Sequence, residues 1–255
     1  MNNHTRHNYK GKTILITGAA TGIGRATAKA FAECGTQVVI GDINPDAAET
    51  VRLIEEKGQN AIFIETDVSD ADSVKNLVEQ TVQKYGIIDF AFNNAGVLCP
   101  TASLADMDEK DFDKTIAVDL KGVFLCMKYE IEAMLKTNGG AIVNTASVAG
   151  VVADPDMAPY VAAKHGVIGL TKAAALDYAQ QNIRVNAIAP GLVRTPMTER
   201  WLSDSKMNEL VTNNNPMHRA AEPQEISSSI LYLCSPEASF VNGSTFVIDG
   251  GQTIH

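Results

Sequence analysis

A tyrosine and a lysine four residues apart are the most chemically suggestive pair in this sequence. On a helix, Tyr160 and Lys164 share a face. A phenol with an unperturbed pKa of about 10 is a poor acid or base at neutral pH, but a neighbouring ammonium favours the phenolate and lowers that pKa. Ser147 ends a predicted strand and can hydrogen-bond the same substrate oxygen. These residue types are those that move a proton to or from an alcohol or ketone oxygen.

A glycine-rich turn near the start of the chain could hold a dinucleotide beside these residues. The segment TGAATGIG places Gly18, Gly22 and Gly24 between a predicted strand and a predicted helix. Glycines there let the backbone approach a pyrophosphate, and free N–H groups at a helix N-terminus favour its negative charge. Thr21 and Ile23 belong to the same turn and to the predicted cofactor site. The spacing differs from the G-x-G-x-x-G fingerprint, so the turn alone is a weak signal.

An aspartate at the end of the second predicted strand bears on the choice of dinucleotide. Asp42 lies about 20 residues beyond the turn, where an acid accepts hydrogen bonds from a ribose 2′-OH. A 2′-phosphate would meet like charge there, and the segment GDIN, which includes Ile43, offers no Arg or Lys to compensate. NAD is therefore predicted in preference to NADP. The alternative is that Asp42 is only a surface turn residue.

Together these motifs resemble those of the short-chain dehydrogenase/reductase family, which combines a T-G-x-x-x-G-x-G turn, an N-N-A-G segment and a Ser…Tyr-x-x-x-Lys constellation. The resemblance runs from about residue 10 to the C-terminus. It implies an alcohol dehydrogenase or ketone reductase with Tyr160 as the acid/base, Ser147 on the substrate oxygen, and Lys164 also holding the nicotinamide ribose. Further cofactor residues that it implies are Asp67 and Val68 near the adenine, Asn94, Ala95 and Gly96 in the N-N-A-G segment, and Pro190, Gly191, Val193 and Thr195 at the nicotinamide end.

Two aspartates leave alternatives open. Asp67 could equally cap the helix that begins near Asp70. Asp119 stands where the family usually has the Asn of its catalytic tetrad, and its backbone carbonyl could keep the family's water relay to Lys164. A carboxylate near that lysine could raise the lysine's pKa and alter the pH profile. We count Asp119 among the candidate catalytic residues and expect activity to survive the replacement.

The order of elements predicts an α/β fold, a single-domain doubly wound (Rossmann-type) parallel sheet of about seven strands with helices on both faces. The motif residues fall at the ends of strands and so converge on one edge of the sheet. Helix-like segments include 70–85, 109–136 and 159–180. The predicted strands cover residues 13–17, 37–41, 61–64, 88–92, 141–145, 183–188 and 244–248.

The predicted domain spans residues 11–255, after a flexible tail of residues 1–10, and carries a substrate lid near 192–216. Apolar residues in and near the lid suggest a hydrophobic or mixed substrate such as a cyclic or aliphatic secondary alcohol, although they could merely pack the lid shut. They are Met197, Trp201, Leu202, Met207, Val151, Val152 and Met157.

Composition bears on partners and location. A formal net charge of −9 and a pI near 5.0 argue against nucleic acid and anionic membranes. Four widely spaced cysteines suggest neither a metal site nor a disulfide framework, which favours the cytoplasm. We expect no secretory signal in residues 1–10 and no membrane span. The family resemblance also implies a homotetramer that pairs the long helices of residues 110–136 and 159–180.

Two other functions remain open. A 3-oxoacyl carrier-protein reductase would usually want NADPH and a basic patch for its acidic carrier, and Asp42 and the overall acidity argue against both. An NAD-sensing interaction protein without turnover would not need Ser147, Tyr160 and Lys164. The substrate itself cannot be named from the sequence.

Overall fold

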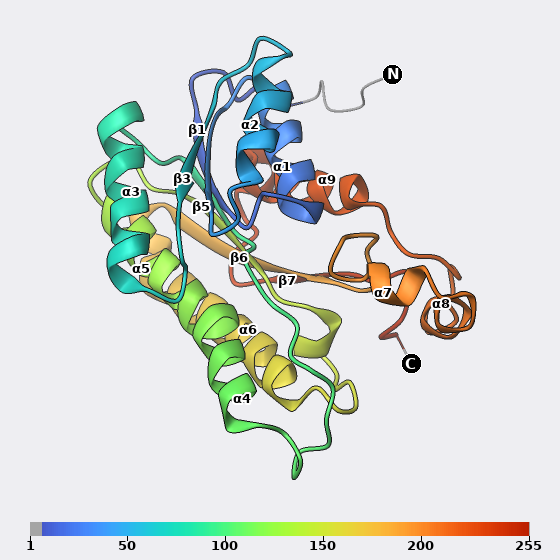
Figure 1. Cartoon of the computed structure of the whole chain (residues 1–255). Coiled ribbons are helices and arrows are strands. Elements are labelled where there is room, and N and C mark those ends of the chain that lie inside the picture. Colours follow the sequence, from blue (N-terminus) through green and yellow to red (C-terminus); the bar gives the residue numbers. More distant parts are fainter. Residues whose placement is uncertain (1–6, 255) are drawn as a thin grey trace.

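A parallel sheet forms the centre of the molecule (Figure 1). The computed structural model describes residues 7–254, and over that range the sheet has seven strands in the order β3-β2-β1-β4-β5-β6-β7. The doubly wound α/β prediction is therefore confirmed. The strands are β1 (Thr13–Thr17), β2 (Gln37–Asp42), β3 (Ala61–Glu65), β4 (Phe90–Asn93), β5 (Gly140–Thr145), β6 (Ile183–Pro190) and β7 (Thr245–Ile248).

Helices cover both faces of the sheet, because each connection between parallel strands must cross over it. One face carries α1 (Gly22–Glu33), α2 (Ala47–Glu55) and α9 (Pro223–Cys234). The other carries α3 (Ala71–Tyr85), α5 (Gly122–Met134) and α6 (Ala158–Tyr178), with α4 (Glu109–Ile116) packed on α6. Among residues 7–254 no helix is both long and apolar enough to cross a bilayer.

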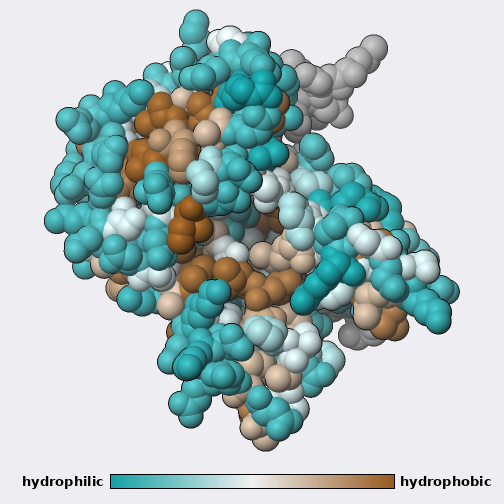
Figure 2. Space-filling model, viewed as in Figure 1, coloured by the Kyte–Doolittle hydropathy of each residue, from teal (hydrophilic) through white to brown (hydrophobic). Residues whose placement is uncertain are grey.

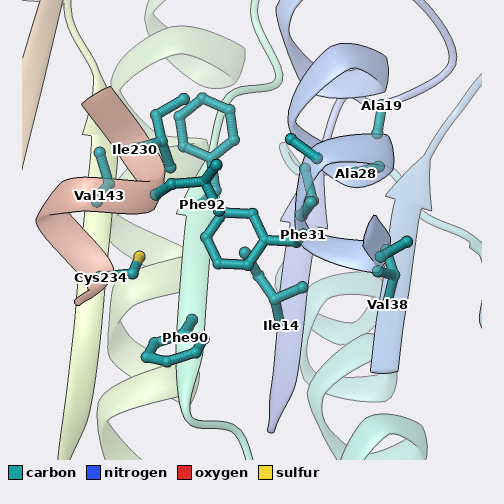
Figure 3. Close-up of a cluster of buried hydrophobic side chains, with 14 of the residues drawn as sticks. Ile14, Ala19, Ala28, Phe31, Val38, Phe90, Phe92, Val143, Ile230 and Cys234 are labelled. Carbon is teal, nitrogen blue, oxygen red and sulfur yellow. The ribbon is translucent and has the colours of Figure 1, made fainter. Parts of the chain in front are cut away.

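The core consists of two apolar layers, one on each side of the sheet. Successive residues of β1 alternate between them: Ile14 lies with Phe31 and Phe92 in one layer (Figure 3), whereas Leu15 lies with Leu77 in the other. Burying each such side chain contributes about 1.5–3 kcal/mol. The strand ends that carry the site residues are therefore held by a rigid, fully buried framework.

The N-terminal segment enters the core earlier than expected. Tyr9 belongs to the predicted tail of residues 1–10, yet it is only 4% exposed. Its ring stacks on Phe31, and its hydroxyl donates to the carbonyl of Leu231 in α9 at 2.7 Å. A buried tyrosine is stabilised when its hydroxyl finds such a partner. The tail prediction is wrong at this end, and residues 1–6 lie outside the described part of the chain.

The helix predicted over residues 109–136 contains one wider turn. A π-helical segment, Ala117–Lys121, separates α4 from α5, and the N–H of Gly122 donates to the carbonyl of Ala117, five residues back. Such turns insert one extra residue and are frequent at functional sites. Here the wide turn contains Asp119, which is fully buried.

Candidate active site

A large cavity opens where the order of strands in the sheet reverses. β1 is followed by β2 on one side and lies beside β4 on the other, and the crevice at the carboxyl ends of such strands is where ligands bind in this architecture. The cavity has a volume of about 1210 Å³. Figure 2 shows a hollow near the middle of the visible face, with hydrophobic residues along part of its border.

Nearly every residue predicted for the site lines this one cavity, and Gly24 is the exception. The lining residues among those predicted are Gly18, Thr21, Gly22, Ile23, Asp42, Ile43, Asp67, Val68, Asn94, Ala95, Gly96, Asp119, Ser147, Tyr160, Lys164, Pro190, Gly191, Val193 and Thr195.

The glycine turn is packed too closely to admit side chains. Gly18 has a φ of +68°, and a Cβ atom there would lie 2.6 Å from the Cα of Ala95. A Cβ on Gly24 would lie 2.2 Å from the carbonyl oxygen of Gly18, so Gly24 supports the turn from behind. The side-chain amide of Asn94 donates to that same carbonyl at 2.8 Å. The end of β4 thus braces the turn and leaves its bare backbone facing the cavity.

Asp42 presents its carboxylate at the far end of the cavity. One oxygen accepts from the N–H of Ala20 at 2.8 Å and the other from the N–H of Asn44 at 2.9 Å. Each oxygen retains a further lone pair for a ligand hydroxyl. The lysines and arginines that line the cavity are Lys114 and Lys164, and neither comes from β2 or the glycine turn. This end of the cavity suits a ribose diol better than a phosphate.

Asp67 does not cap the following helix, so that alternative is wrong. The cap of α3 is Asp70, whose carboxylate accepts from the N–H of Ser73 at 3.2 Å. Asp67 instead accepts from the N–H and hydroxyl of Ser69, at 2.9 and 2.7 Å. A capping side chain must stand immediately before the first helical residue, and Asp67 lies too early. Its place in the cavity wall agrees with the other interpretation.

Tyr160 and Lys164 lie one turn apart near the start of α6 and face the same cavity as Ser147. The ammonium of Lys164 is 5.3 Å from the centre of the Tyr160 ring and donates to the carbonyl of Thr145 at 3.1 Å. Thr145 ends β5, and Ser147 follows two residues later. The strand end and the helix therefore bring together the three residues that the sequence pattern predicted.

Asp119 forms an ion pair with Lys164. Its Oδ2 lies 3.1 Å from the lysine nitrogen, the two side chains are 0% and 3% exposed, and its Oδ1 accepts from the N–H of Val97 at 2.8 Å. Burial alone lowers the pKa of Lys164, but the charges of Asp119 and Tyr160 and the hydrogen bond to Asp119 raise it above its ordinary value. The carboxylate therefore raises the lysine's pKa, as expected from the sequence.

The pKa of Tyr160 lies above its ordinary value, whereas the sequence pattern predicted a lowered one. Burial raises it most, because a phenolate is costly away from water. Lys164 lowers it, as does a hydrogen bond with Ser147, but Asp119 and Asp154 raise it again. Lys164 acts in the expected direction, yet Asp119 offsets its charge. The phenol is held in its protonated form.

The segment that was expected to form a lid closes one side of the cavity. It carries α7 (Glu199–Leu202) and α8 (Ser205–Thr212), and Met197, Trp201 and Met207 line the wall. Met157 lines it from the start of α6.

Two valines that the sequence pattern assigned to the substrate region lie elsewhere. Val151 and Val152 border a second cavity of about 610 Å³ and are 43% and 42% exposed. The short helical turn after Ser147 contributes Val148 to the wall of the main cavity instead.

Sequence reasoning missed several polar residues of the wall. Lys114, Asp154 and Gln252 all line the cavity. Burial raises the pKa of Asp154. None of the three belongs to a recognisable motif, and each reaches the cavity from a loop or helix that only the tertiary structure brings there. Residues 7–254 hold no group of His, Cys, Asp or Glu side chains arranged to bind a metal ion.

Comparisons with known proteins agree with this geometry. Residues 18–253 match the family model described as enoyl-(acyl carrier protein) reductase. The chain is 43% identical over 245 residues to 2,5-dichloro-2,5-cyclohexadiene-1,4-diol dehydrogenase of Sphingobium indicum, covering 95% of this chain and 97% of the relative. It is 41% identical to cyclohexanol dehydrogenase of an Acinetobacter species, covering 96% of each chain. The crystal structure of levodione reductase superimposes with a TM-score of 0.94 at 36% identity, covering 97% of this chain and 99% of that one.

Proposed function

The chain belongs to the short-chain dehydrogenase/reductase family, and from this we propose that it is an NAD-dependent dehydrogenase of cyclic secondary alcohols. As a member of that family it is an oxidoreductase that transfers a hydride between a nicotinamide cofactor and a secondary alcohol or ketone. One observation carries the proposal: Tyr160, Lys164 and Ser147 face the same cavity as the glycine turn and Asp42.

The residues at the adenosine end fit a dinucleotide. A Cβ atom at Gly18 would collide with the backbone of Ala95, so this turn must keep its bare backbone, and Asp42 keeps free lone pairs for a ribose 2′-OH. The carboxylate of Asp42 would repel a 2′-phosphate, so we propose NAD rather than NADP. When bound, the nicotinamide ring gives or accepts the hydride.

The chain's own residues handle the proton. Tyr160 gives its phenolic proton to the ketone oxygen in reduction and takes the alcohol proton in oxidation. Ser147 donates a hydrogen bond to the same oxygen as its negative charge develops. Asp119 holds Lys164 in an ion pair, and Lys164 keeps a positive charge beside the phenol. Because the pKa of Tyr160 is raised, alcohol oxidation gains rate as the pH rises towards that pKa, whereas ketone reduction keeps its protonated donor until the pH approaches it.

The substrate region favours a ring without a strong charge. Its wall combines Met157, Met197 and Trp201, which suit an alicyclic body, with the hydrogen-bonding pair Tyr160 and Ser147 at the reacting end. Relatives at 41% and 43% identity are named for the oxidation of cyclohexanol and of a cyclohexadiene diol. These names support a cyclic secondary alcohol as the substrate class.

The first experiment measures the absorbance of reduced nicotinamide with NAD or NADP across a panel of cyclic and open-chain secondary alcohols. We expect turnover with NAD that Tyr160→Phe abolishes. Tyr178→Phe is the matched control, because it makes the same change on the same helix outside the cavity. If no alcohol or ketone is turned over although NADH binds tightly, the protein is an NAD sensor and the proposal is wrong.

The cofactor preference has its own test. Asp42→Asn should raise kcat/KM with NADP relative to NAD, whereas Asp46→Asn, on an exposed residue outside the cavity, should leave that ratio unchanged. A preference for NADP in the wild type would contradict the proposal. It would favour the 3-oxoacyl carrier-protein reductase alternative, which the acidity of the chain otherwise disfavours.

Assembly and location complete the proposal. We propose a homotetramer that pairs α4, α5 and α6, since Phe112, Phe124 and Leu176 on these helices are 41%, 47% and 83% exposed. Sedimentation equilibrium tests it, and a monomer at micromolar concentration would refute it. We place the protein in the cytoplasm, which suits its buried, reduced cysteines, Cys34, Cys99, Cys126 and Cys234.

A further inference from the structure

Asp154 puts a carboxylate into the wall of the substrate region. It lies in the loop between the turn Val148–Gly150 and helix α6, and it borders both the main cavity and the second one. Within residues 7–254 its side chain makes no hydrogen bond and no ion pair. Burial raises its pKa, and no donor from the protein offsets that cost.

No side chain among residues 7–254 donates to Asp154. The wall of the main cavity also contains apolar side chains such as Met157 and Met197. Of the two lysines in the wall, Lys164 is already paired with Asp119, and Lys114 makes no ion pair with Asp154. A half-buried carboxylate without a donor is costly, and such a group in a cavity is a candidate for ligand recognition.

Asp154 also acts on the reacting end of the cavity. Both residues line the main cavity, and the charge of Asp154 makes a small contribution that raises the pKa of Tyr160. A substrate whose reacting oxygen lies at Tyr160 and Ser147 therefore shares the cavity with the unsatisfied acceptor of Asp154.

We propose that Asp154 accepts a hydrogen bond from a second hydroxyl group of the substrate, so that the enzyme selects cyclic diols over simple cyclic alcohols. The same charge disfavours substrates that carry a carboxylate in place of that hydroxyl. The inference rests on the proposed function, because it assumes that a secondary alcohol reacts at Tyr160.

The test compares kcat/KM for cyclohexane-1,4-diol and cyclohexanol with NAD. Wild type should favour the diol, and Asp154→Leu should reduce the diol-to-cyclohexanol ratio by about tenfold to hundredfold, the size expected for a hydrogen bond to a charged group. The ratio for Asp154→Asn should lie between those of the wild type and Asp154→Leu, since the amide carbonyl still accepts a hydrogen bond. Removing the charge also alters the pKa of Tyr160, but this affects both substrates alike, and the ratio isolates recognition of the second hydroxyl.

Two further probes sharpen the test. 4-Hydroxycyclohexanecarboxylate should be a poor substrate of the wild type and improve in both Asp154 variants. Asp156 borders the same two cavities at a more exposed position, so Asp156→Asn tests the competing carboxylate and should alter the diol ratio less than twofold. A diol ratio that responds to Asp156 and not to Asp154 would overturn the assignment, as would a tenfold preference for 4-aminocyclohexanol over the diol.

Failure of this inference differs from failure of the proposed function. Tyr160-dependent oxidation of cyclohexanol with a diol ratio near one, unaffected by Asp154, would sink the inference and leave the dehydrogenase assignment standing. If no alcohol is oxidised, calorimetric binding of the diol and of cyclohexanol to the NAD-saturated protein still tests whether Asp154 recognises the second hydroxyl. The diol must then bind at least tenfold more tightly, and Asp154→Leu must remove that difference.

Discussion

The buried ion pair between Asp119 and Lys164 leads to a quantitative prediction about stability. The two charged atoms are 3.1 Å apart and almost inaccessible to water. At an effective dielectric constant of about 20, Coulomb's law gives an attraction of ~5 kcal/mol at that separation. Breaking a buried pair by removing one partner costs about 3–5 kcal/mol, because the other charge is left uncompensated.

The perturbation is a double-mutant cycle of Asp119→Asn and Lys164→Met. Each single variant leaves one buried charge alone, whereas the double variant leaves none, and the amide oxygen introduced by Asp119→Asn can still accept from the N–H of Val97. The double variant should therefore lose less stability than the two single losses combined. We expect a coupling free energy of about 3 kcal/mol or more.

Urea unfolding followed by circular dichroism at pH 7 and one protein concentration measures the cycle. The pair Glu49 and Arg52 provides the control, because it is closer, at 2.7 Å, but exposed on α2. Glu49→Gln and Arg52→Met should show little coupling. Additivity of Asp119→Asn and Lys164→Met within about 0.5 kcal/mol would refute the reasoning that burial gives this pair its strength.

Three further predictions concern other parts of the fold. Burial raises the pKa of Glu130 to about 8, so this residue should cost about 1.4 kcal/mol of stability per pH unit between pH 5 and 8, where its carboxyl is ionised only in the unfolded chain. Glu130→Gln should remove that contribution from the pH dependence of the unfolding free energy, and an equal slope in both proteins would contradict this. Gly24→Ala forces a methyl group to within 2.2 Å of the Gly18 carbonyl. This variant should lower the free energy of unfolding by about 1–3 kcal/mol and weaken NADH binding, which fluorescence measures. Unchanged affinity for NADH would show that the turn adapts. Tyr9→Phe leaves the Leu231 carbonyl without its donor and should lower the free energy of unfolding, measured in urea, by about 1–3 kcal/mol. If this segment were frayed, the substitution would leave the free energy of unfolding unchanged.

Features that depend on neighbours in the chain were predictable from the sequence. The alternation of β-rich runs with helical periodicity predicted the doubly wound sheet, since strands and helices each have their own spacing of apolar residues. Tyr160 and Lys164 face the same cavity because residues four apart on a helix share a side. Gly18 and Asp42 reach the cavity because parallel strands end at one edge of the sheet.

Features that depend on the packing of distant segments appeared only in the tertiary structure. The family resemblance placed a carboxylate near Lys164, but the buried ion pair itself forms because the π-helical turn that carries Asp119 packs against another helix. Asp154 borders the cavity, and Tyr9 enters the core, through contacts with segments remote in sequence. The sequence by itself determined the order of elements and the residue types within each, because those follow from local periodicity and backbone preference. The packing of the elements decided which charges lie close together, and this in turn raised the pKa of Tyr160.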